Sequence, residues 1–384
     1  MKRVLSRVIP VLLLSWPISV RAITPDKPEF KKLADDVYVY VGKLNDANAM
    51  VVVTSQGVVL VDTGNSQPET RNIQKYIQSV TSQPVRYIIL TQDHGDHIGG
   101  TPLFSPPATV ILQERVAKHW AQWKPNAVQA WQKRFPERAE ILQNFHPLDA
   151  TVSFSDHMTL RLGGKIMELI YVDDIYNPGD IAVWFPESGV LHGGFVGYKE
   201  RHPDIRPDYS HGTTWGMLKQ LEALIALQPK AIVPGHGPVM DSKDLQAMVD
   251  YLLIARQRVR GMMEQGMTLE AIRKEFHMNE YKGWDRTIHL PVMAAAIYRE
   301  LKGEGPEVSP VVEKKVEGKI TSTQEEGRYL TVVSSDGQQI LLTISSADIE
   351  GIPDRSHFRV GMKLTVTYEE RKDRNETLEI KVEP

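Results

Sequence analysis

The 384-residue chain contains no cysteine, which excludes disulfides, thiolate metal ligands, a cysteine nucleophile and a lipid-modified cysteine anchor. It also lacks an excess of basic charge. The 45 Lys and Arg residues against 48 Asp and Glu residues leave a net charge of −3, which argues against electrostatic nucleic-acid binding. Beyond the N-terminus no apolar run approaches the roughly 18 residues of a membrane helix. The composition, 41% hydrophobic and 24% charged, is that of a globular protein of two or three domains.

The first 22 residues have the parts of a secretory signal peptide. A start that contains lysine and arginine is followed by thirteen uncharged residues, 8–20, and short side chains stand at Val20 and Ala22. This pattern predicts cleavage after Ala22 and a periplasmic or secreted protein, exported from a bacterium. The alternative is an uncleaved membrane anchor. Cleavage is favoured because the run is shorter than the roughly 20 residues of a span.

Residues 30–303 alternate between strand and helix patterns, which predicts an α/β domain whose sheets are covered by helices on the outside. The run 37–41, which alternates valine and tyrosine, predicts a strand. The valine-rich run 49–61, with a turn signal at its centre, predicts a hairpin. Apolar residues at helical spacing after Pro68 predict a helix.

Two later stretches in this region are less regular. Residues 151–172 are expected to form two strands around Gly163 and Gly164. The tryptophan-rich stretch 113–145 is expected to be helical. Its tryptophans would form either a lid over a site or ordinary helix packing.

The composition changes near Gly303, where glycines and a proline predict a linker, and residues 304–384 are expected to form a second domain. Five short strand-like runs predict a small all-β barrel of the OB type. This tail has no tryptophan and more acidic than basic residues, so it lacks the stacking platform and basic groove of a nucleic-acid binder. We expect it to contact protein or to influence substrate access. The runs are 319–323, 330–333, 339–344, 363–368 and 378–382.

The segment Leu90–Gly100 contains the clearest chemical signal. Asp93, His94, Asp96 and His97 follow an apolar strand pattern and precede two glycines. Imidazole nitrogens and carboxylate oxygens both bind zinc, and a catalytic zinc site needs about three such ligands and an open position. A polar surface turn is the alternative, but such a turn rarely carries so many ligands after a buried strand. The segment therefore predicts a metal site.

This segment resembles the His-x-His-x-Asp-His signature of the metallo-β-lactamase superfamily. Four further segments are similar to motifs of that family, in the same order and at similar spacing. The resemblance covers about residues 36–240. It implies a metallo-β-lactamase-like αββα sandwich with the metal site at one edge of the two sheets. The four segments are the strand end 62–64, the turn 176–180, the strand 190–195 and the loop 233–238.

The resemblance also implies which residues bind metal. One ion of the family's pair would take Asp96, His97 and His236, and all three ligands are present. In the signature, the first two histidine positions of the other ion are Gln92 and His94.

The remaining positions of that second ion depart further from the family. Its third histidine position corresponds to Tyr176, and the bridging position corresponds to Phe195, which cannot coordinate. Gln92 and Tyr176 remain candidate ligands through an amide oxygen and a phenolate. Ligation by Tyr176 is costly because a phenol has a pKa near 10 and must lose its proton to bind the metal. The alternative is that both have lost ligation, which leaves a mononuclear site.

Three neighbouring features have open interpretations. Asp62 is expected either to accept a hydrogen bond from a ligand histidine or to cap the turn at its strand end. His192 follows a strand pattern, and alternation leaves the direction of its side chain undecided. The proline-rich loop 201–211 is expected near the metal edge, as a pocket wall, a source of a substitute ligand or a surface loop.

These features predict an exported metal-dependent hydrolase in which metal-activated water attacks an ester, amide or phosphoester of a small molecule. We expect about one ion per chain, zinc or another divalent metal. Asp96, Asp93 and His94 are the catalytic candidates. The alternative is a non-catalytic periplasmic binding or scaffold protein that retains the fold. Neither nucleic acid nor, after signal cleavage, a membrane is expected as a partner.

Overall fold

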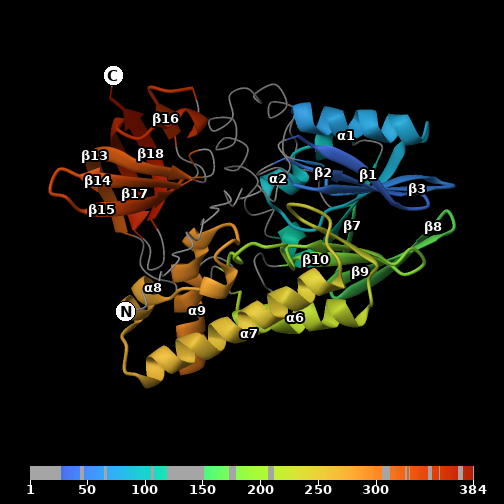
Figure 1. Ribbon diagram of the computed structural model, residues 1–384. Coiled ribbons are helices and arrows are strands. Elements are labelled where there is room, and N and C mark those ends of the chain that lie inside the picture. Colours follow the sequence, from blue (N-terminus) through green and yellow to red (C-terminus); the bar gives the residue numbers. More distant parts are fainter. Residues whose placement is uncertain are drawn as a thin grey trace, which may run out of the picture.

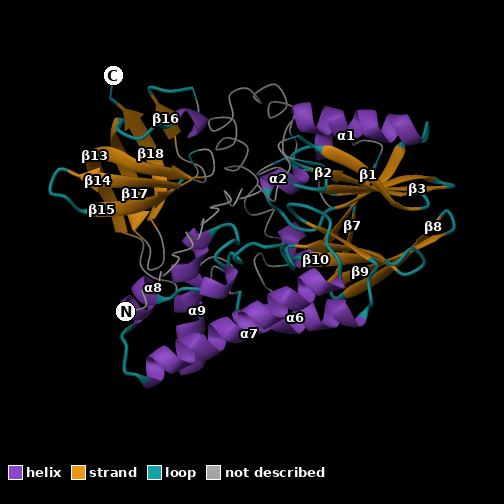
Figure 2. Ribbon diagram, viewed as in Figure 1, coloured by secondary structure: helices purple, strands orange, loops and turns teal. Residues whose placement is uncertain are grey.

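The computed structural model describes residues 27–43, 47–64, 67–104, 108–118, 151–172, 179–205, 212–304, 312–324, 327, 329–344, 348–353, 355–370 and 375–383. The predicted signal peptide, Tyr176 and most of the stretch 113–145 lie outside these residues. Two sheets with their helices form the larger part of the molecule, and a third sheet forms the C-terminal part (Figures 1 and 2). Within the described ranges, no helix is both long and apolar enough to cross a bilayer.

The first sheet contains seven strands that lie in sequence order. Its valine-rich strands are buried on both faces. Along β4, Val58 and Leu60 pack with residues of the covering helix α1, whereas Val59 and Val61 face the second sheet. This alternation places one face against a helix and the other in the centre of the molecule. The elements are β1 (Glu29–Ala34), β2 (Val37–Val41), β3 (Ala49–Thr54), β4 (Gly57–Val61), α1 (Gln67–Val80), β5 (Val85–Ile89), β6 (Thr109–Gln113) and β7 (Val152–Phe154).

The second sheet has the strand order β12-β11-β10-β9-β8. Along β10, Ile181 and Val183 pack against the first sheet, whereas Ala182 and Trp184 pack against the helical layer. Figure 1 shows α1 outside the first sheet and α6 and α7 outside the second, so the layers follow the predicted αββα order. The elements are β8 (His157–Leu162), β9 (Lys165–Tyr171), β10 (Ile181–Phe185), β11 (Val190–Gly194), α6 (Thr214–Ala226), β12 (Ala231–Pro234) and α7 (Ser242–Glu264).

The two strands predicted around Gly163 and Gly164 are confirmed, but residues 151–172 contain a third strand that the sequence did not indicate. β8 and β9 form the expected hairpin around Gly163 and Gly164, whose φ angles are 52° and 85°. β7 instead pairs in parallel with β6 of the first sheet. Local sequence could not indicate this pairing, since β6 lies about 40 residues earlier in the chain.

Short helical elements complete this part of the chain. The helix α9 ends where Gly303 adopts a left-handed conformation with φ 71°, a common way to end a helix. The elements are α2 (Gly95–Ile98), η1 (Thr101–Leu103), α8 (Leu269–Glu275), η3 (Asn279–Tyr281), η4 (Thr287–His289) and α9 (Leu290–Lys302).

The C-terminal sheet is a closed barrel. Its order is β15-β14-β13-β17-β18-β16, and a further pairing of β15 with β18 joins five strands into a circle. The sixth strand, β16, was not expected from the sequence. The barrel interior is a cluster of its own, which includes Leu330, Leu342 and Leu364. The predicted boundaries 30–303 and 304–384 stay predictions. The elements are β13 (Val312–Gln324), β14 (Tyr329–Ser334), β15 (Gln339–Thr343), β16 (Asp348–Glu350), η5 (Arg355–His357), β17 (Lys363–Glu370) and β18 (Asn375–Val382).

Candidate metal centre

The ends of three strands and the short helix α2 meet at one edge of the sandwich. Asp62 follows β4, Thr91 follows β5 and His236 follows β12. The backbone and the hydroxyl of Thr63 both donate to the His97 carbonyl, at 2.7 and 2.9 Å. These bonds tie the α2 turn to the end of β4, so the residues of the predicted metal segment are fixed against the sheet.

Asp62 orients His97. Its Oδ1 accepts the Thr91 backbone N–H at 2.8 Å, and its Oδ2 accepts the Thr91 hydroxyl at 2.7 Å. Oδ2 also lies 2.7 Å from Nδ1 of His97. A carboxylate can only accept, so Nδ1 carries the proton and Nε2 presents its lone pair. Asp62 is buried in a left-handed conformation with φ 57°, and it both caps the strand end and orients the histidine.

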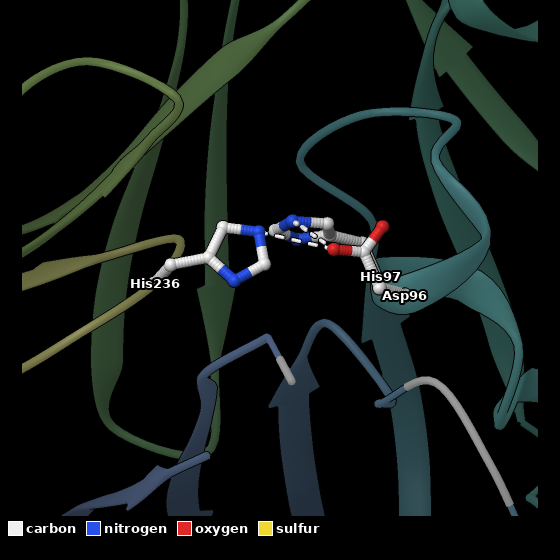
Figure 3. A group of neighbouring side chains, drawn as sticks. All are labelled: Asp96, His97 and His236. Atoms are coloured by element: carbon white, nitrogen blue, oxygen red, sulfur yellow. Dashed lines mark ion pairs between the residues drawn. The ribbon is translucent and has the colours of Figure 1, made fainter. Parts of the chain in front are cut away.

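Asp96, His97 and His236 form the group that could hold a metal ion (Figure 3). Nε2 of His236 lies 3.0 Å from Oδ2 of Asp96, and Nε2 of His97 lies 3.8 Å from the same oxygen. The three ligand atoms lie within 4.8 Å of one another. Figure 3 shows His236 approaching from one loop and the other two side chains from the opposite segment. Two nitrogens and one oxygen at these separations fit a tetrahedral zinc ion with about 2.0–2.2 Å bonds and one open position.

Burial and mutual charge set the protonation of this group. Burial alone would raise the pKa of Asp96, but the charges of His97 and His236 hold it well below the ordinary value. Burial also opposes the charged form of His97, yet the carboxylates of Asp62 and Asp96 raise its pKa to about 8. The pKa of His236 is lowered because burial outweighs its bond to Asp96.

Gln92 is hydrogen-bonded to Nε2 of His97, the nitrogen that would bind a metal. Its fully buried side chain places Nε2 2.8 Å from Nε2 of His97. In the neutral form of His97, whose Nδ1 donates to Asp62, Nε2 accepts a hydrogen bond from the Gln92 amide. The amide must move before a metal can bind His97. Direct ligation by Gln92 stays a prediction.

The remaining predicted residues are placed differently. His94 is the N-cap residue of α2 and lies outside the three-residue group, although its charge contributes to lowering the pKa of Asp96. Asp93 is buried beside it in the sequence. Tyr176 lies outside the described residues. Phe195 is buried, with its ring edge-on to Tyr198 at 5.4 Å, so the expected bridging position contributes an apolar ring.

His192 points between the two sheets, towards the back of the site. It is fully buried, and its Nε2 lies 3.9 Å from Oδ2 of Asp62. Its Nδ1 accepts the Gly194 backbone N–H at 3.2 Å. Burial lowers its pKa to about 4, so it is neutral at neutral pH. Alternation along β11 agrees with this direction, since Val190 faces the centre and Leu191 faces the helices. Both residues are apolar, so the sequence alone left the direction undecided.

Asn48 was missed by the sequence analysis, although it positions the loop that presents His236. Its amide donates to the carbonyls of Pro234 and Gly237, at 2.7 and 2.8 Å. Its backbone N–H donates to the Gly235 carbonyl at 2.8 Å. A buried asparagine just before a strand of apolar residues was the only local signal.

A pocket opens beside His236. Part of the predicted proline-rich loop forms its wall, together with neighbouring residues. The guanidinium carbon of Arg201 lies 5.6 Å from the centre of the Tyr198 ring, and Lys199 forms an ion pair with Asp244 at 3.1 Å. The wall is therefore polar and carries charges of both signs, Lys199 and Arg201 beside Asp285. Its residues are Tyr198, Lys199, Arg201, His236, Gly237, Pro238 and Asp285.

The fold and the metal group agree with a comparison to known families. Residues 42–236, slightly more than half of the chain, match the model of the Metallo-beta-lactamase superfamily. The chain belongs to this superfamily. The matched region runs from the end of β2 to His236, so it contains the whole candidate metal group.

Relatives with different names share this fold. A metallo-beta-lactamase type 2 from Bacteroides fragilis is 23% identical over 240 residues, which cover 59% of this chain and 88% of the relative. The 2,4-dinitroanisole O-demethylase subunit alpha from Nocardioides sp. (strain JS1661) is 27% identical over 197 residues, which cover 50% and 52%. The names of these two enzymes indicate different reactions, so the match to them does not identify a substrate.

Solved structures support the same fold. The stereoselective inverting sec-alkylsulfatase Pisa1 from Pseudomonas sp. has a TM-score of 0.56 at 16% identity, over 71% of this chain and 50% of that one. A metallo-beta-lactamase family protein from Thermus thermophilus has a TM-score of 0.52 at 18% identity, over 74% and 97%. The chain thus shares the fold of these proteins.

Proposed function

We propose that this chain is an exported metal-dependent hydrolase with a single zinc ion between Asp96, His97 and His236. The observation that carries the proposal is the convergence of these three side chains, with the ligand atoms within 4.8 Å of one another. The donor set is normal for catalytic zinc, and one position remains for water. A bound zinc ion would supply Lewis acidity and lower the pKa of its water towards 7.

The chain's own residues would prepare this chemistry. Asp62 keeps the proton of His97 on Nδ1 and so directs Nε2 to the ion. Asp96 is a catalytic candidate because its carboxylate lies between the two histidines, and its lowered pKa keeps it ionised as a zinc ligand. Asp93 and His94 are the further candidates for orienting water or accepting its proton.

The substrate we propose is a small molecule with an ester, amide or phosphoester bond. The wall near His236 carries polar and charged side chains that can bind the polar groups of such a substrate. The names of the relatives, a lactamase, a demethylase subunit and a sulfatase, are compatible with a small-molecule substrate.

We propose one ion and not two because the site has too few negative side chains to hold a pair of dications. Paired dications roughly 3.5–4 Å apart need negative groups to offset their repulsion. Phe195 supplies none at the position that the family uses for a bridge, and the Gln92 amide is bonded to His97. Among the described residues, only one group of three metal-binding side chains occurs.

Elemental analysis after dialysis against zinc tests the proposal. We expect about one equivalent in the full chain, none in His97→Ala, and one in the control His157→Ala, whose residue is exposed on β8. Two retained equivalents, with one lost in Gln92→Ala, would overturn the single-ion site. A panel of generic ester, lactam, phosphodiester and sulfate ester substrates then tests hydrolysis.

A non-catalytic binding or scaffold protein is the second candidate. The apolar ring of Phe195 and the amide of Gln92 at the metal edge favour it. A protein that retains no metal and turns over no member of the panel would support this candidate against the hydrolase.

We propose export on the evidence of residues 1–22 alone. Mass spectrometry of protein from the periplasm or medium should give a chain that begins at Ile23. A chain that begins at Met1 in that fraction would contradict cleavage after Ala22.

A further inference from the structure

The segment from Tyr198 to Ile205 connects the pocket to the rest of the molecule. Its first half lines the pocket beside His236 through Tyr198, Lys199 and Arg201. Its backbone is tied to Asp285 in the connection before α9. The His202 N–H donates to the Asp285 carbonyl at 2.9 Å, and the Asp285 N–H donates to the Glu200 carbonyl at 2.8 Å. These two bonds fix the backbone on either side of Arg201.

Side chains anchor the same segment from behind. His202 is 1% exposed, and its Nδ1 lies 2.7 Å from the Tyr251 hydroxyl of α7. The Tyr251 ring stacks on Trp284, with ring centres 4.8 Å apart. Arg201 and His202 thus belong to a buried polar and aromatic layer rather than to a free surface loop.

A hydrogen bond between His289 and Tyr329 joins this layer to the C-terminal barrel. His289, buried just before α9, places Nδ1 3.0 Å from the His202 carbonyl and Nε2 3.3 Å from the Tyr329 hydroxyl. Tyr329 is the first residue of β14 and is 3% exposed. The carbonyl can only accept, so Nδ1 of His289 donates to it. In the neutral ring, Nε2 then accepts from the tyrosine hydroxyl.

We propose that the C-terminal barrel positions the wall of the pocket. Tyr329 and His289 act as positioning residues: the tyrosine hydroxyl fixes the histidine ring, and the ring fixes the His202 carbonyl, one residue after Arg201. Figure 1 agrees with this route, since the barrel lies on the side of α8 and α9, away from α1. This role of the barrel does not require that the chain be a hydrolase.

Hydrogen exchange of two backbone amides tests whether the barrel holds the pocket wall. The His202 and Asp285 amides donate the two hydrogen bonds that bracket Arg201, so their hydrogen exchange reports whether the segment is held. The experiment uses the full chain without added metal. The test variant is Tyr329→Phe, which removes one hydroxyl. The matched control is Tyr368→Phe, since Tyr368 belongs to the barrel's own interior cluster.

In Tyr329→Phe we expect the peptides 198–205 and 283–288 to exchange roughly two- to ten-fold faster, the factor that one hydrogen bond contributes. Other peptides should be unchanged, and Tyr368→Phe should leave 198–205 unchanged. If all peptides of Tyr329→Phe exchanged faster by the same factor, the contact would only stabilise the whole protein, and the proposal would be overturned. Unchanged exchange at 198–205 would overturn it as well.

A second variant tests the same route from the histidine. His289→Asn keeps an amide donor close to the position of Nδ1 and has no atom at the position of Nε2. We expect it to match Tyr329→Phe, and the double variant to exchange no faster than either single one. Additive effects would mean that the two side chains act independently, which would contradict the proposal.

Discussion

Asp62 accepts three hydrogen bonds in the interior, two from Thr91 and one from His97. A buried carboxylate is costly unless such donors surround it. The same bonds determine which nitrogen of His97 is free for a metal. At the scale of single residues, one side chain therefore stabilises a strand end and prepares a ligand.

We expect Asp62→Asn to weaken zinc binding by about 10- to 100-fold, the usual effect of losing a partner behind a metal ligand. The amide no longer offers a charged acceptor to Nδ1 of His97. Zinc affinity measured by competition with a chelator tests this. Asp35→Asn is the control because the Asp35 side chain is exposed and pairs only locally with Lys32. Equal affinity in Asp62→Asn and the parent chain would contradict the role.

His202 should make stability depend on pH. Burial lowers its pKa to about 4 from the ordinary 6.5, so the unfolded chain binds more protons between these two pH values. The free energy of unfolding should therefore fall as the pH drops from about 6.5 to 4. One such group contributes a slope of at most about 1.4 kcal/mol per pH unit.

Denaturant titrations at pH 4.5, 5.5 and 6.5 measure this slope. His202→Gln should reduce it, whereas part of the slope should persist because the pKa of buried His192 is also lowered to about 4. A slope unchanged by His202→Gln would show that His202 does not titrate as expected.

At the scale of elements, the loop after β12 shows why the metal group depends on close backbone approach. A Cβ at Gly235 would lie 2.9 Å from the Gly194 carbonyl oxygen and 3.1 Å from Cε1 of His97. Asn48 binds the loop on both sides of that glycine. The loop therefore has one position relative to His97, and this position brings His236 to Asp96.

We expect Gly235→Ala to destabilise the protein by about 1–3 kcal/mol, as overpacking does, and to weaken zinc binding because the loop must move. Thermal unfolding and chelator competition measure the two effects. Gly261→Ala is the control, since nothing lies within 4 Å of its Cβ position in α7 and alanine favours a helix. A Gly235→Ala variant with normal zinc affinity would show that the loop has room.

At the scale of the whole molecule, the sandwich and the barrel have separate interior clusters, and the Tyr329 contact with His289 links them. We expect residues 1–305 to fold without the barrel, because the sheets and α6, α7 and α9 bury their apolar faces within that part. Circular dichroism and thermal unfolding of this fragment test the prediction. A fragment that does not unfold cooperatively would make the barrel part of the main core and would move the predicted boundary.

The sequence predicted much of the architecture because local patterns determine local elements. Runs of β-branched, aromatic and other apolar residues between turn signals indicated β2 to β5 and most barrel strands. The density of ligands in Leu90–Gly100 indicated Asp96 and His97. The sequence analysis missed β1, β6, β7 and β16, of which β7 and β16 are three residues long and are defined by pairing with distant strands. Three residues have too little pattern to show which sheet they join.

The sequence by itself determined the types of ligand, the order of the motifs and the family to which they point. Only the tertiary structure decided which groups meet. It brought His236 to Asp96 across about 140 residues, aimed His192 at Asp62, and bonded Gln92 to His97. It also joined Tyr329 of the barrel to His289. The physical reason is that hydrogen bonds act over about 3 Å and depend on direction. Packed sheets and loops determine which side chains come within such a distance. The spacing of residues along the chain shows only which side chains could do so.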